Sequence, residues 1–442
     1  MKIHAVGGYG LVGRNMTIYE SDNDAVVVDM GLHLDNYIAY QEAENEKRHI
    51  DRSLLQKIGA VPDLRPVHSL KGKVRAIVIT HGHLDHVGAV QFLEQEFDAP
   101  IIATPLTAAI LRALAKDTRS RLKNRIHVVK QGARYKISDD LTIEFIRAAH
   151  SIPETSLIAF HTSKGVYLHA SDFKFDDQPG VGAKTDVKRL SQLKGNVRAV
   201  VVDTLNGDEQ VKTPSESVAR ELLKDVLNHK ELEGKGIIVS TFSSHLSRLK
   251  TAYQMGKKLN RRVVFAGRSL DKYLTAGKSV GLVDFPDAEM IGFARKVRAR
   301  LREIEKEGKE KYLIIATGHQ GEPGSVLERI ARGELKFRMH DNDAIVFSCS
   351  VIPAPQNIEN RAKLEHALED RNVRIFKDVH VSGHLSQEDH RFLFELVRPD
   401  IVIPTHSDFE QARAIMPMMR RLGYRDEQFV LLSEGEHYTV PH

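Results

Sequence analysis

Residues 75–90, RAIVITHGHLDHVGAV, place three histidines and an aspartate within six positions, directly after an apolar run. The run is rich in Val and Ile, which predicts a buried strand. Alternate residues of a strand project to the same side, so His81 and His83 are expected to face one way. Asp85 and His86 follow at the start of a predicted helix. Imidazole and carboxylate groups are ligands that zinc prefers, so this turn predicts a metal site.

Three further donors stand in similar settings, each shortly after a predicted strand. They are His150 after LTIEFI, Asp172 after GVYLHA and His406 after DIVIPT. Asp29, after the run AVVV, is expected to orient a ligand histidine rather than to bind a metal itself. Any one of these histidines could simply satisfy backbone groups at a strand end. Their combination with HGHLDH favours two metal ions bound close together.

The composition predicts a globular protein of more than one domain, with 442 residues of which 41% are apolar and 28% charged. The single cysteine, Cys349, excludes a disulfide framework and fits a reducing cytoplasm. No apolar run approaches the roughly 20 residues that span a bilayer, and the start MKIHAVGGYG does not resemble a signal peptide. The net charge of +5 permits a polyanionic partner, whereas 22 histidines raise the expectation of a metal site.

Short runs rich in Val and Ile, such as DAVVVDMG and VRAVVVDT, alternate with helical patterns such as VGAVQFLEQEF and LTAAILRALAK. This alternation predicts an α/β fold with its chemistry at the C-terminal ends of strands. After Asp203 a second, doubly wound α/β pattern begins. From about residue 357 the pattern resembles the first part again, so we expect an inserted middle domain. The predicted boundaries are 1–205 and 357–442 for the outer domain and 206–356 for the insertion.

The motif HGHLDH is similar to the signature of the metallo-β-lactamase superfamily. The stretches GGYGLVGRNMTIYE near the start, TGHQGEP at 317–323 and HVSGHLSQED at 380–389 narrow the resemblance to the ribonuclease J family. The resemblance extends over nearly the whole chain. It implies a metallo-β-lactamase αββα sandwich that carries an inserted β-CASP domain. His319, and the short stretch after the last motif, favour the archaeal type of this family.

The resemblance implies a pair of divalent cations, with zinc expected and manganese as the alternative. The implied ligands form two sets with one shared residue: His81, His83 and His150 for one ion, Asp85, His86 and His406 for the other, and Asp172 as the bridge. Two adjacent metals suit phosphodiester hydrolysis, because they neutralise the phosphate and lower the pKa of water.

The same resemblance implies catalytic and substrate-binding roles. Asp203 and His384 would supply a proton to the leaving 3′ oxygen, and Asp85 is counted with them as catalytic. A structural alternative for Asp203 is a turn-forming residue before a loop. The implied pocket for a 5′-monophosphate uses two motifs: His380, Val381, Ser382, Gly383 and His384, together with Ser348 and Ser350. For Ser348, a strand end before a Pro-rich connector is an equally good interpretation.

The implied function is a zinc-dependent ribonuclease, mainly a 5′-to-3′ exonuclease on single-stranded RNA with a 5′-monophosphate, acting through a metal-bound hydroxide. The resemblance further implies a homodimer. The lone cysteine and the lack of a long apolar run favour a cytoplasmic location with no membrane association. An RNA endonuclease of the polyadenylation-factor type would use the same ligands and differ in how RNA reaches them. A thioesterase or lactonase of the superfamily shares HGHLDH but does not need the inserted domain. A non-catalytic RNA-binding protein would not need the full ligand set.

One basic segment is expected to have no specific partner. Residues 295–311, RKVRARLREIEKEGKEK, mix both charge signs, which is typical of a solvated helix face. The chain contains no Trp, so the sequence does not predict an aromatic-rich stacking platform for RNA.

Overall fold

The computed structural model describes residues 1–43, 51–118, 121–352 and 354–441. It divides the chain into two compact units, each built from segments that are distant in sequence. The first unit comprises Met1–Asp177, Gly182–Pro214 and Ser382–His442, and the second comprises Gln178–Val181 and Ser215–Val381. The second unit is therefore inserted into the first, which confirms the predicted architecture.

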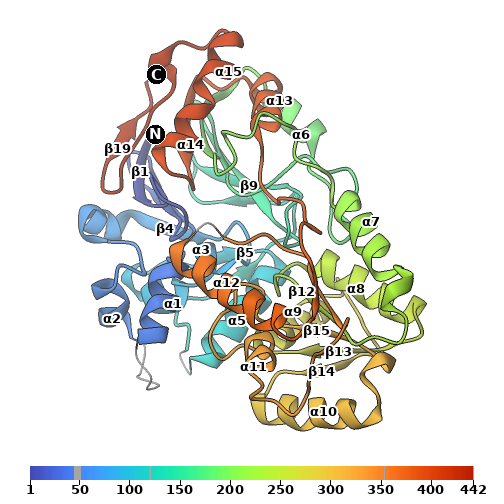
Figure 1. The fold of residues 1–442 in the computed structure, drawn as a ribbon. Coiled ribbons are helices and arrows are strands. Elements are labelled where there is room, and N and C mark those ends of the chain that lie inside the picture. Colours follow the sequence, from blue (N-terminus) through green and yellow to red (C-terminus); the bar gives the residue numbers. More distant parts are fainter. Residues whose placement is uncertain (44–50, 119–120, 353, 442) are drawn as a thin grey trace. The chain divides into compact units, whose positions relative to one another are not determined.

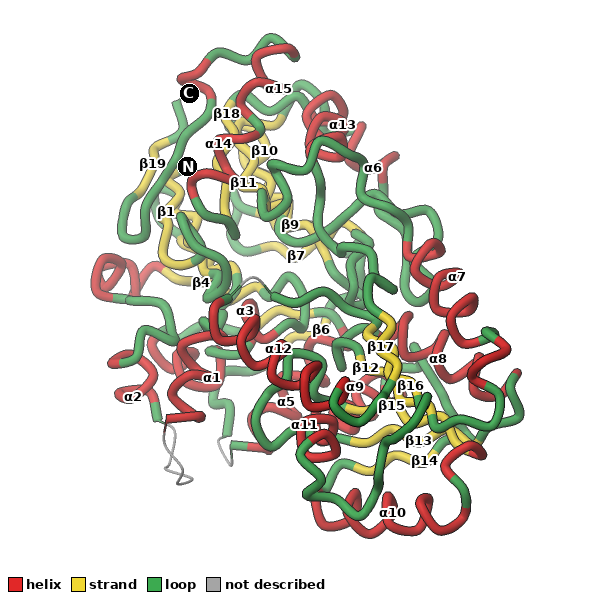
Figure 2. The backbone as a smooth tube through the Cα atoms, in the orientation of Figure 1, coloured by secondary structure: helices red, strands yellow, loops and turns green. Residues whose placement is uncertain are grey.

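Two sheets form the framework of the first unit (Figures 1 and 2). The seven-stranded sheet has the order β19 (His437–Thr439), β1 (Lys2–Gly7), β2 (Met16–Glu20), β3 (Ala25–Val28), β4 (Val74–Val78), β5 (Ile101–Ala103) and β6 (Ile126–Val128). The six-stranded sheet has the order β18 (Ile401–Thr405), β11 (Val197–Asp203), β10 (Gly165–Ala170), β9 (Ser156–Thr162), β8 (Thr142–Arg147) and β7 (Arg134–Lys136). Neighbours from β3 to β6 are parallel, as are β10, β11 and β18. Six of the seven predicted metal ligands follow the C-terminal ends of the parallel strands β4, β10 and β18, and His150 follows the antiparallel strand β8.

The alternation of side chains along β11 explains why its sequence is apolar without interruption. Ala199 and Val201 belong to the core between the two sheets, which also includes Val28 of β3. Val200 and Val202 point to the opposite face and pack in a second core with helices of the same unit. A strand that is covered on both faces needs apolar residues at every position. The layers therefore correspond to the predicted sandwich of two sheets with helices outside.

The helices of the first unit are short. They are α1 (Leu34–Ala43), α2 (Arg52–Lys57), α3 (Leu84–Val87), α4 (Val90–Leu93), α5 (Pro105–Asp117), α6 (Val187–Ser191), α13 (Gln387–Val397), α14 (Phe409–Ala414) and α15 (Met416–Arg421), with 3-10 turns at Arg65–Lys73, Glu94–Glu96 and Asp426–Gln428. The continuous helix predicted for VGAVQFLEQEF is broken into short pieces. At the break the backbone N–H of Ala89 donates to the carbonyl of Met30, outside the helix. Among the described residues, no helix combines the length and apolarity needed to cross a membrane.

The second unit is a doubly wound α/β layer around one parallel sheet (Figure 2). The strand order is β14 (Glu289–Ile291), β13 (Arg262–Ala266), β15 (Tyr312–Ala316), β12 (Ile237–Ser240), β16 (Ala344–Phe347) and β17 (Arg374–Phe376). The helices are α7 (Glu216–Leu227), α8 (Leu246–Lys258), α9 (Arg268–Ser279), α10 (Ala294–Glu307), α11 (Val326–Ala331) and α12 (Pro355–Glu369), with 3-10 turns at Lys230–Leu232 and Lys309–Lys311.

The return to the first unit comes later than predicted. The predicted boundary at residue 357 would place α12 and β17 in the outer domain, but both belong to the second unit. The reason is strand pairing: Ile375 of β17 lies in register with Ile345 of β16. Leu364 and Leu368 of α12 pack in the core of the same unit. The structure likewise starts the insertion at Ser215 rather than at residue 206.

Candidate metal centre

The loop that carries HGHLDH is held on both sides by neighbouring loops of the first unit. It runs from β4 to α3, and His83 is the residue that precedes the first turn of α3. The backbone N–H of Asn15 donates to the carbonyl of Asp85 over 2.9 Å. A Cβ atom at Gly31 would lie 1.6 Å from that carbonyl oxygen, so only glycine fits there. The loop conformation is thus imposed by its surroundings.

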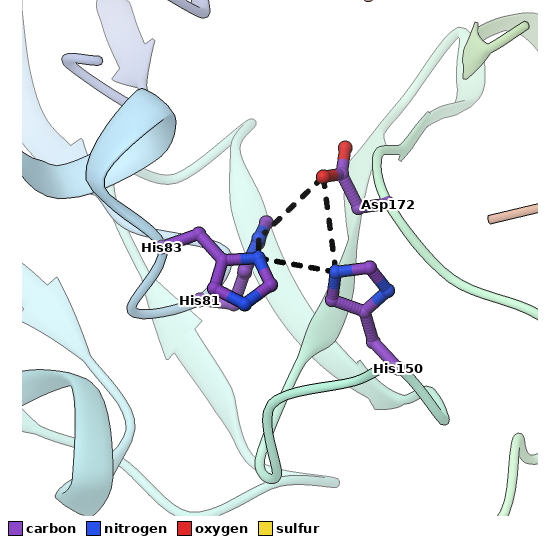
Figure 3. A group of neighbouring side chains, drawn as sticks. All are labelled: His81, His83, His150 and Asp172. Carbon is purple, nitrogen blue, oxygen red and sulfur yellow. Dashed lines mark hydrogen bonds and ion pairs between the residues drawn. The ribbon is translucent and has the colours of Figure 1, made fainter. Parts of the chain in front are cut away.

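The first donor group consists of His81, His83, His150 and Asp172. Figure 3 shows these four side chains pointing toward one another, with His81 and His83 on one loop and His150 and Asp172 on two others. The Nδ1 atom of His83 lies 3.1 Å from His81 Nε2 and 3.2 Å from His150 Nε2. Asp172 Oδ2 lies 3.6 Å from His81 Nε2 and 3.9 Å from His150 Nε2. Four donor atoms therefore surround one point.

The second donor group consists of Asp85, His86, Asp172 and His406. Asp172 Oδ2 lies 3.2 Å from His86 Nε2 and 3.8 Å from His406 Nε2. Asp85 Oδ2 lies 3.5 Å and 3.7 Å from the same two nitrogens. Asp172 thus belongs to both groups through the same oxygen atom.

These spacings fit metal coordination. Zinc–ligand bonds of about 2.0–2.1 Å in a tetrahedron separate the ligand atoms by about 3.3–3.4 Å. The observed separations, from 3.1 to 3.9 Å, bracket that value. Several of these distances, between two histidine nitrogens or between a nitrogen and a carboxylate oxygen, are too long for strong hydrogen bonds. The donor set therefore fits a pair of cations.

The charges of the cluster also favour bound cations. The carboxylates of Asp29, Asp85 and Asp172 all lie within 3.5 Å of a His86 ring nitrogen. Over the described ranges, neither lysine nor arginine pairs with any of the three. Buried carboxylates need compensating positive charge, and divalent cations would supply it.

Three of the five rings are oriented by a hydrogen bond at the nitrogen that faces away from the donor groups. His83 differs, because its Nδ1 faces the group and its Nε2 lies 3.5 Å from Ser151 Oγ. His81 Nδ1 lies 3.0 Å from the Thr80 hydroxyl, and His150 Nδ1 donates to the Gly383 carbonyl over 2.8 Å. His406 Nδ1 lies 3.0 Å from the side-chain oxygen of Asn15. Such bonds fix the tautomer and leave Nε2 free for the metal.

Asp29 holds the His86 ring and anchors the loop at the same time. It adopts a left-handed backbone with φ 62° directly after β3. Its Oδ1 accepts the backbone N–H of Thr80, and its Oδ2 accepts the Thr80 hydroxyl and His86 Nδ1, all over 2.8 Å. Asp29 therefore contacts a histidine of the second donor group, and its role in orienting a metal ligand stays a prediction.

The ionisation of the histidines follows from their burial and their neighbours. Burial lowers the pKa of His81 and His150 well below the usual value, and lowers the pKa of His83 to about 4. These rings are neutral at pH 7, the form that binds a metal. Burial acts in the same direction on His86, but Asp172 and the other carboxylates outweigh it and raise its pKa. A metal bound by His86 would displace that proton.

A third group joins Asp172 to Asp203 and His384. His384 Nδ1 donates to Asp203 Oδ2 over 2.7 Å and lies 4.0 Å from Asp172 Oδ2. Burial would lower the pKa of His384, but the carboxylates of Asp203 and Asp172 outweigh it and raise the pKa to about 9 in the metal-free protein. The backbone carbonyl of Asp203 accepts a bond from His390 Nε2 over 2.7 Å. Asp203 is thus held in place from two sides.

Ser382 and Gly383 lie beside this group in the first unit. The Ser382 oxygen accepts bonds from the Asn206 amide over 2.8 Å and from the His384 backbone N–H over 3.1 Å. Its hydroxyl hydrogen can therefore donate outward. A Cβ atom on Gly383 would lie 2.9 Å from His150 Nδ1, so glycine is needed for the approach of a ligand ring.

The other residues predicted to bind phosphate belong to the second unit. Ser348 is fully buried, and its hydroxyl donates to the Val379 carbonyl over 2.8 Å. A phosphate contact would require that bond to break. Ser350 is exposed, and its carbonyl accepts the Gln320 side chain over 3.0 Å. His380 is half-buried, with Nδ1 3.4 Å from Arg248, and Val381 is buried. The phosphate-binding role of these residues stays a prediction.

The structure brings all seven predicted metal ligands together within one unit. It adds residues that the sequence reasoning missed: Asn15, Thr80, Asn206 and His390. Asn15 stands in the quoted stretch GGYGLVGRNMTIYE, but nothing in its local pattern indicates that it contacts a residue 391 positions away.

Comparisons with known proteins agree with this geometry. A model of the metallo-beta-lactamase superfamily matches residues 9–178, and a model described as ribonuclease J, beta-CASP domain, matches residues 234–363. Ribonuclease J of Pyrococcus abyssi is 38% identical over 99% of this chain and 96% of its own length. Ribonuclease J of Methanocaldococcus jannaschii is 39% identical over 99% of this chain and 98% of its own. A crystal structure of a protein of unknown function from Enterococcus faecalis V583 shares the fold, with a TM-score of 0.66, 13% identity and 99% of both chains covered.

Proposed function

This chain belongs to the ribonuclease J family, and we propose that it is a metal-dependent ribonuclease that removes nucleotides from the 5′ end of RNA with a 5′-monophosphate. The observation that carries the proposal is the convergence of seven histidine and aspartate side chains into two donor groups that share Asp172. Small-molecule hydrolysis is a weaker alternative, because the second unit matches a domain model described for ribonuclease J.

The two donor groups would hold two divalent cations. When bound, such a pair neutralises charge on the phosphate oxygens and lowers the pKa of water. Asp172 would keep the two sites adjacent, and Asp29 and Asn15 would hold ligand rings in the binding orientation. The histidine-rich donor set favours zinc, with manganese as the alternative.

His384 is proposed as the proton donor. Its Nδ1–H is held by Asp203, so the ring is oriented and kept protonated. The Nε2–H can then be transferred to the 3′ oxygen as its bond to phosphorus breaks, and water afterwards returns the proton to the ring. Asp203 acts through His384 and is therefore a positioning residue. Asp85, predicted as catalytic, would act as a metal ligand.

Ser382 is proposed to contact the 5′-monophosphate. Its oxygen already accepts two hydrogen bonds, so its hydroxyl hydrogen is directed to an acceptor such as a phosphate oxygen. A homodimer, based on the family resemblance, and a cytoplasmic location, based on the single cysteine, are further proposals. Light scattering of the purified protein and fractionation of cells test these two proposals.

The test compares RNAs that differ only at the 5′ end, carrying a monophosphate or a hydroxyl, with a label at an internal nucleotide. We expect the monophosphate RNA to decay faster and to release mononucleotides. Asp172→Asn should abolish cleavage and reduce bound metal, because the residue shared by both donor groups loses its negative charge and keeps only a neutral amide oxygen. Asp177→Asn is the matched control, since Asp177 is exposed and pairs only with Lys184 over the described residues. Elemental analysis of each preparation identifies the ion and its stoichiometry.

Contrary outcomes separate the alternatives. Equal decay of both RNAs with internal fragments only would establish an endonuclease instead. Hydrolysis of a thioester or lactone without cleavage of RNA would replace the proposal by a small-molecule hydrolase. Cleavage that persists in Asp172→Asn would refute the assigned metal centre.

A further inference from the structure

Helix α10 of the second unit has one apolar face and one strongly basic face. Val297, Leu301 and Ile304 are buried in the core of the unit. The spacing of three and four residues places these side chains on one side of the helix. Arg295, Lys296, Arg298 and Arg302 are exposed, so they occupy the remaining surface.

Basic and acidic residues alternate in the sequence, but in the structure they differ in position and in whether they have partners. The acidic residues stand in the last turns and have partners: Glu307 accepts from Arg262, Glu303 pairs with Arg300, and Glu305 accepts the backbone N–H of Arg338. Arg300 points back to the sheet edge, where it binds Glu289 through two hydrogen bonds of 2.6 and 2.8 Å. The helix surface is solvated, as expected, but its charges are not evenly mixed, because the first turns carry only cations.

No acidic residue occurs from 294 to 302. Within the described ranges, the four cations Arg295, Lys296, Arg298 and Arg302 form no ion pair. Arg295, Arg298 and Arg302 follow the spacing i, i+3, i+7, so they form one stripe about 10 Å long. Unpaired cations of one sign in a stripe attract a polyanion rather than a single ion.

An exposed aromatic ring lies at the N-terminal end of α10, beside Lys296. Phe293, directly before α10, is 63% exposed, the highest value among the large apolar side chains of the described residues. The Lys296 ammonium lies 5.9 Å from the centre of its ring. An exposed aromatic ring costs free energy in water, and a nucleic-acid base could stack on it. An acidic peptide would use the cations and leave the ring unexplained.

We propose that the α10 basic face, defined as Phe293, Arg295, Lys296, Arg298 and Arg302, binds single-stranded RNA. The cations would contact phosphates, and the Phe293 ring would stack on a base. This contact uses residues of the second unit and none of the metal ligands. It rests on the proposed function only in taking RNA as the polyanion.

The test measures binding without cleavage. Metal-free full-length protein is titrated with a fluorescent 12-nucleotide single-stranded RNA that carries a 5′-hydroxyl, at several salt concentrations. Each phosphate contact contributes about 0.7 to the slope of log K against log salt for single strands. The variant Arg295→Gln, Arg298→Gln, Arg302→Gln should therefore lower the slope by about 2 and weaken binding about tenfold or more at 0.1 M salt. Phe293→Ala should weaken binding about fivefold or more with the slope unchanged.

Two control variants make the result specific. Lys230→Gln, Lys258→Gln, Lys336→Gln removes the same charge from exposed positions spread over the second unit, and should change the slope by much less. Arg295→Lys, Arg298→Lys, Arg302→Lys keeps the charge and should restore the slope. Thermal unfolding of every variant should match that of the unmodified protein, since the substituted side chains are exposed.

Three results would overturn the inference. One is unchanged affinity and slope in the glutamine variant of α10, and another is an equal loss in the scattered control. The third is displacement of the RNA by polyglutamate at equal charge concentration with no effect of Phe293→Ala, which would assign the face to an acidic protein. Cleavage assays with zinc run in parallel separate the two proposals. If the protein cleaves RNA but does not bind it at α10, only this inference is refuted. If it binds RNA at α10 but does not cleave it, only the proposed nuclease activity is refuted.

Discussion

Replacing Asp29 by asparagine tests whether this carboxylate orients His86 for metal binding. The Asp29 carboxylate accepts three hydrogen bonds of 2.8 Å, two from Thr80 and one from His86 Nδ1. An asparagine can keep the bond from the Thr80 backbone through its remaining oxygen. Its NH₂ group then faces the Thr80 hydroxyl and His86 Nδ1. The histidine must either lose its partner or move its proton to Nε2, the nitrogen that the metal needs.

The loss of metal affinity expected for Asp29→Asn follows from this mismatch between the amide and His86 Nδ1. Removal of a group that orients a ligand histidine typically weakens metal binding by 10–100-fold, or about 1.4–2.7 kcal/mol. The ion held with His86 should be weakened most, because the first donor group does not contain this ring. The metal-free protein should also lose about 1.5–3 kcal/mol of stability, since hydrogen bonds to a buried charge are lost.

The assay titrates metal-free protein with zinc against a competing chelator and measures urea unfolding with the chelator in excess. Asp24→Asn is the matched control. Asp24 precedes the same strand at its other end and accepts Arg75 Nε over 2.9 Å, remote from the ligands along β3. It should leave zinc affinity unchanged. Wild-type zinc affinity in Asp29→Asn, or an equal loss in Asp24→Asn, would refute this reasoning.

Two further predictions concern the first unit. Burial opposes ionisation of Glu144, but hydrogen bonds from a histidine and from Arg189 outweigh it and lower its pKa to about 2. Its contribution to stability is therefore complete above pH 4.5 and is lost as the pH falls from 4.5 toward 2, so Glu144→Gln should cost about 2–4 kcal/mol at pH 7 and much less near pH 2 in urea unfolding. Gly383→Ala should push the His150 ring away from the donor group, because the new Cβ would lie 2.9 Å from it, and should weaken zinc binding about tenfold in the chelator assay.

These two changes have simple controls. Gly72→Ala adds a Cβ that meets nothing within 4 Å and should leave zinc binding unaltered. Glu427→Gln removes a carboxylate that is exposed and should shift stability little at any pH. A pH-independent loss in Glu144→Gln would show that packing, not charge, gives Glu144 its effect. Full zinc affinity in Gly383→Ala would show that the His150 ring has room to move.

The metal ligands could be predicted because each follows a recognisable apolar strand. His81 and His83 are separated by one residue, and the parallel ends of β10, β11 and β18 bring Asp172 and His406 to the same edge. The order and direction of the strands therefore bring these residues together, and the apolar runs in the sequence already indicate those strands. The helix over 87–97 was harder to predict, because its backbone bonds elsewhere at Ala89.

Other features could not be predicted from local patterns. Asn15 is polar in a stretch of ordinary composition, and its role depends on His406, which folding alone brings near. The stretch VRIF at 373–376 suits a strand in either unit, so only its pairing with β16 shows that it belongs to the insertion. The basic face of α10 was hidden by the alternation of charges, because the sequence does not show which acidic residues are already paired.

The parallel pairing of β11 with β18 joins Asp203 to Thr405 across the whole inserted unit. A ribosome must therefore synthesise the second unit before it delivers His406 to the ligand set. A nascent chain that ends before this residue has only six of the seven donors, however well its earlier segments have folded. The order of translation thus delays completion of the second donor group until residue 406 has been made, after residues 215–381 of the second unit.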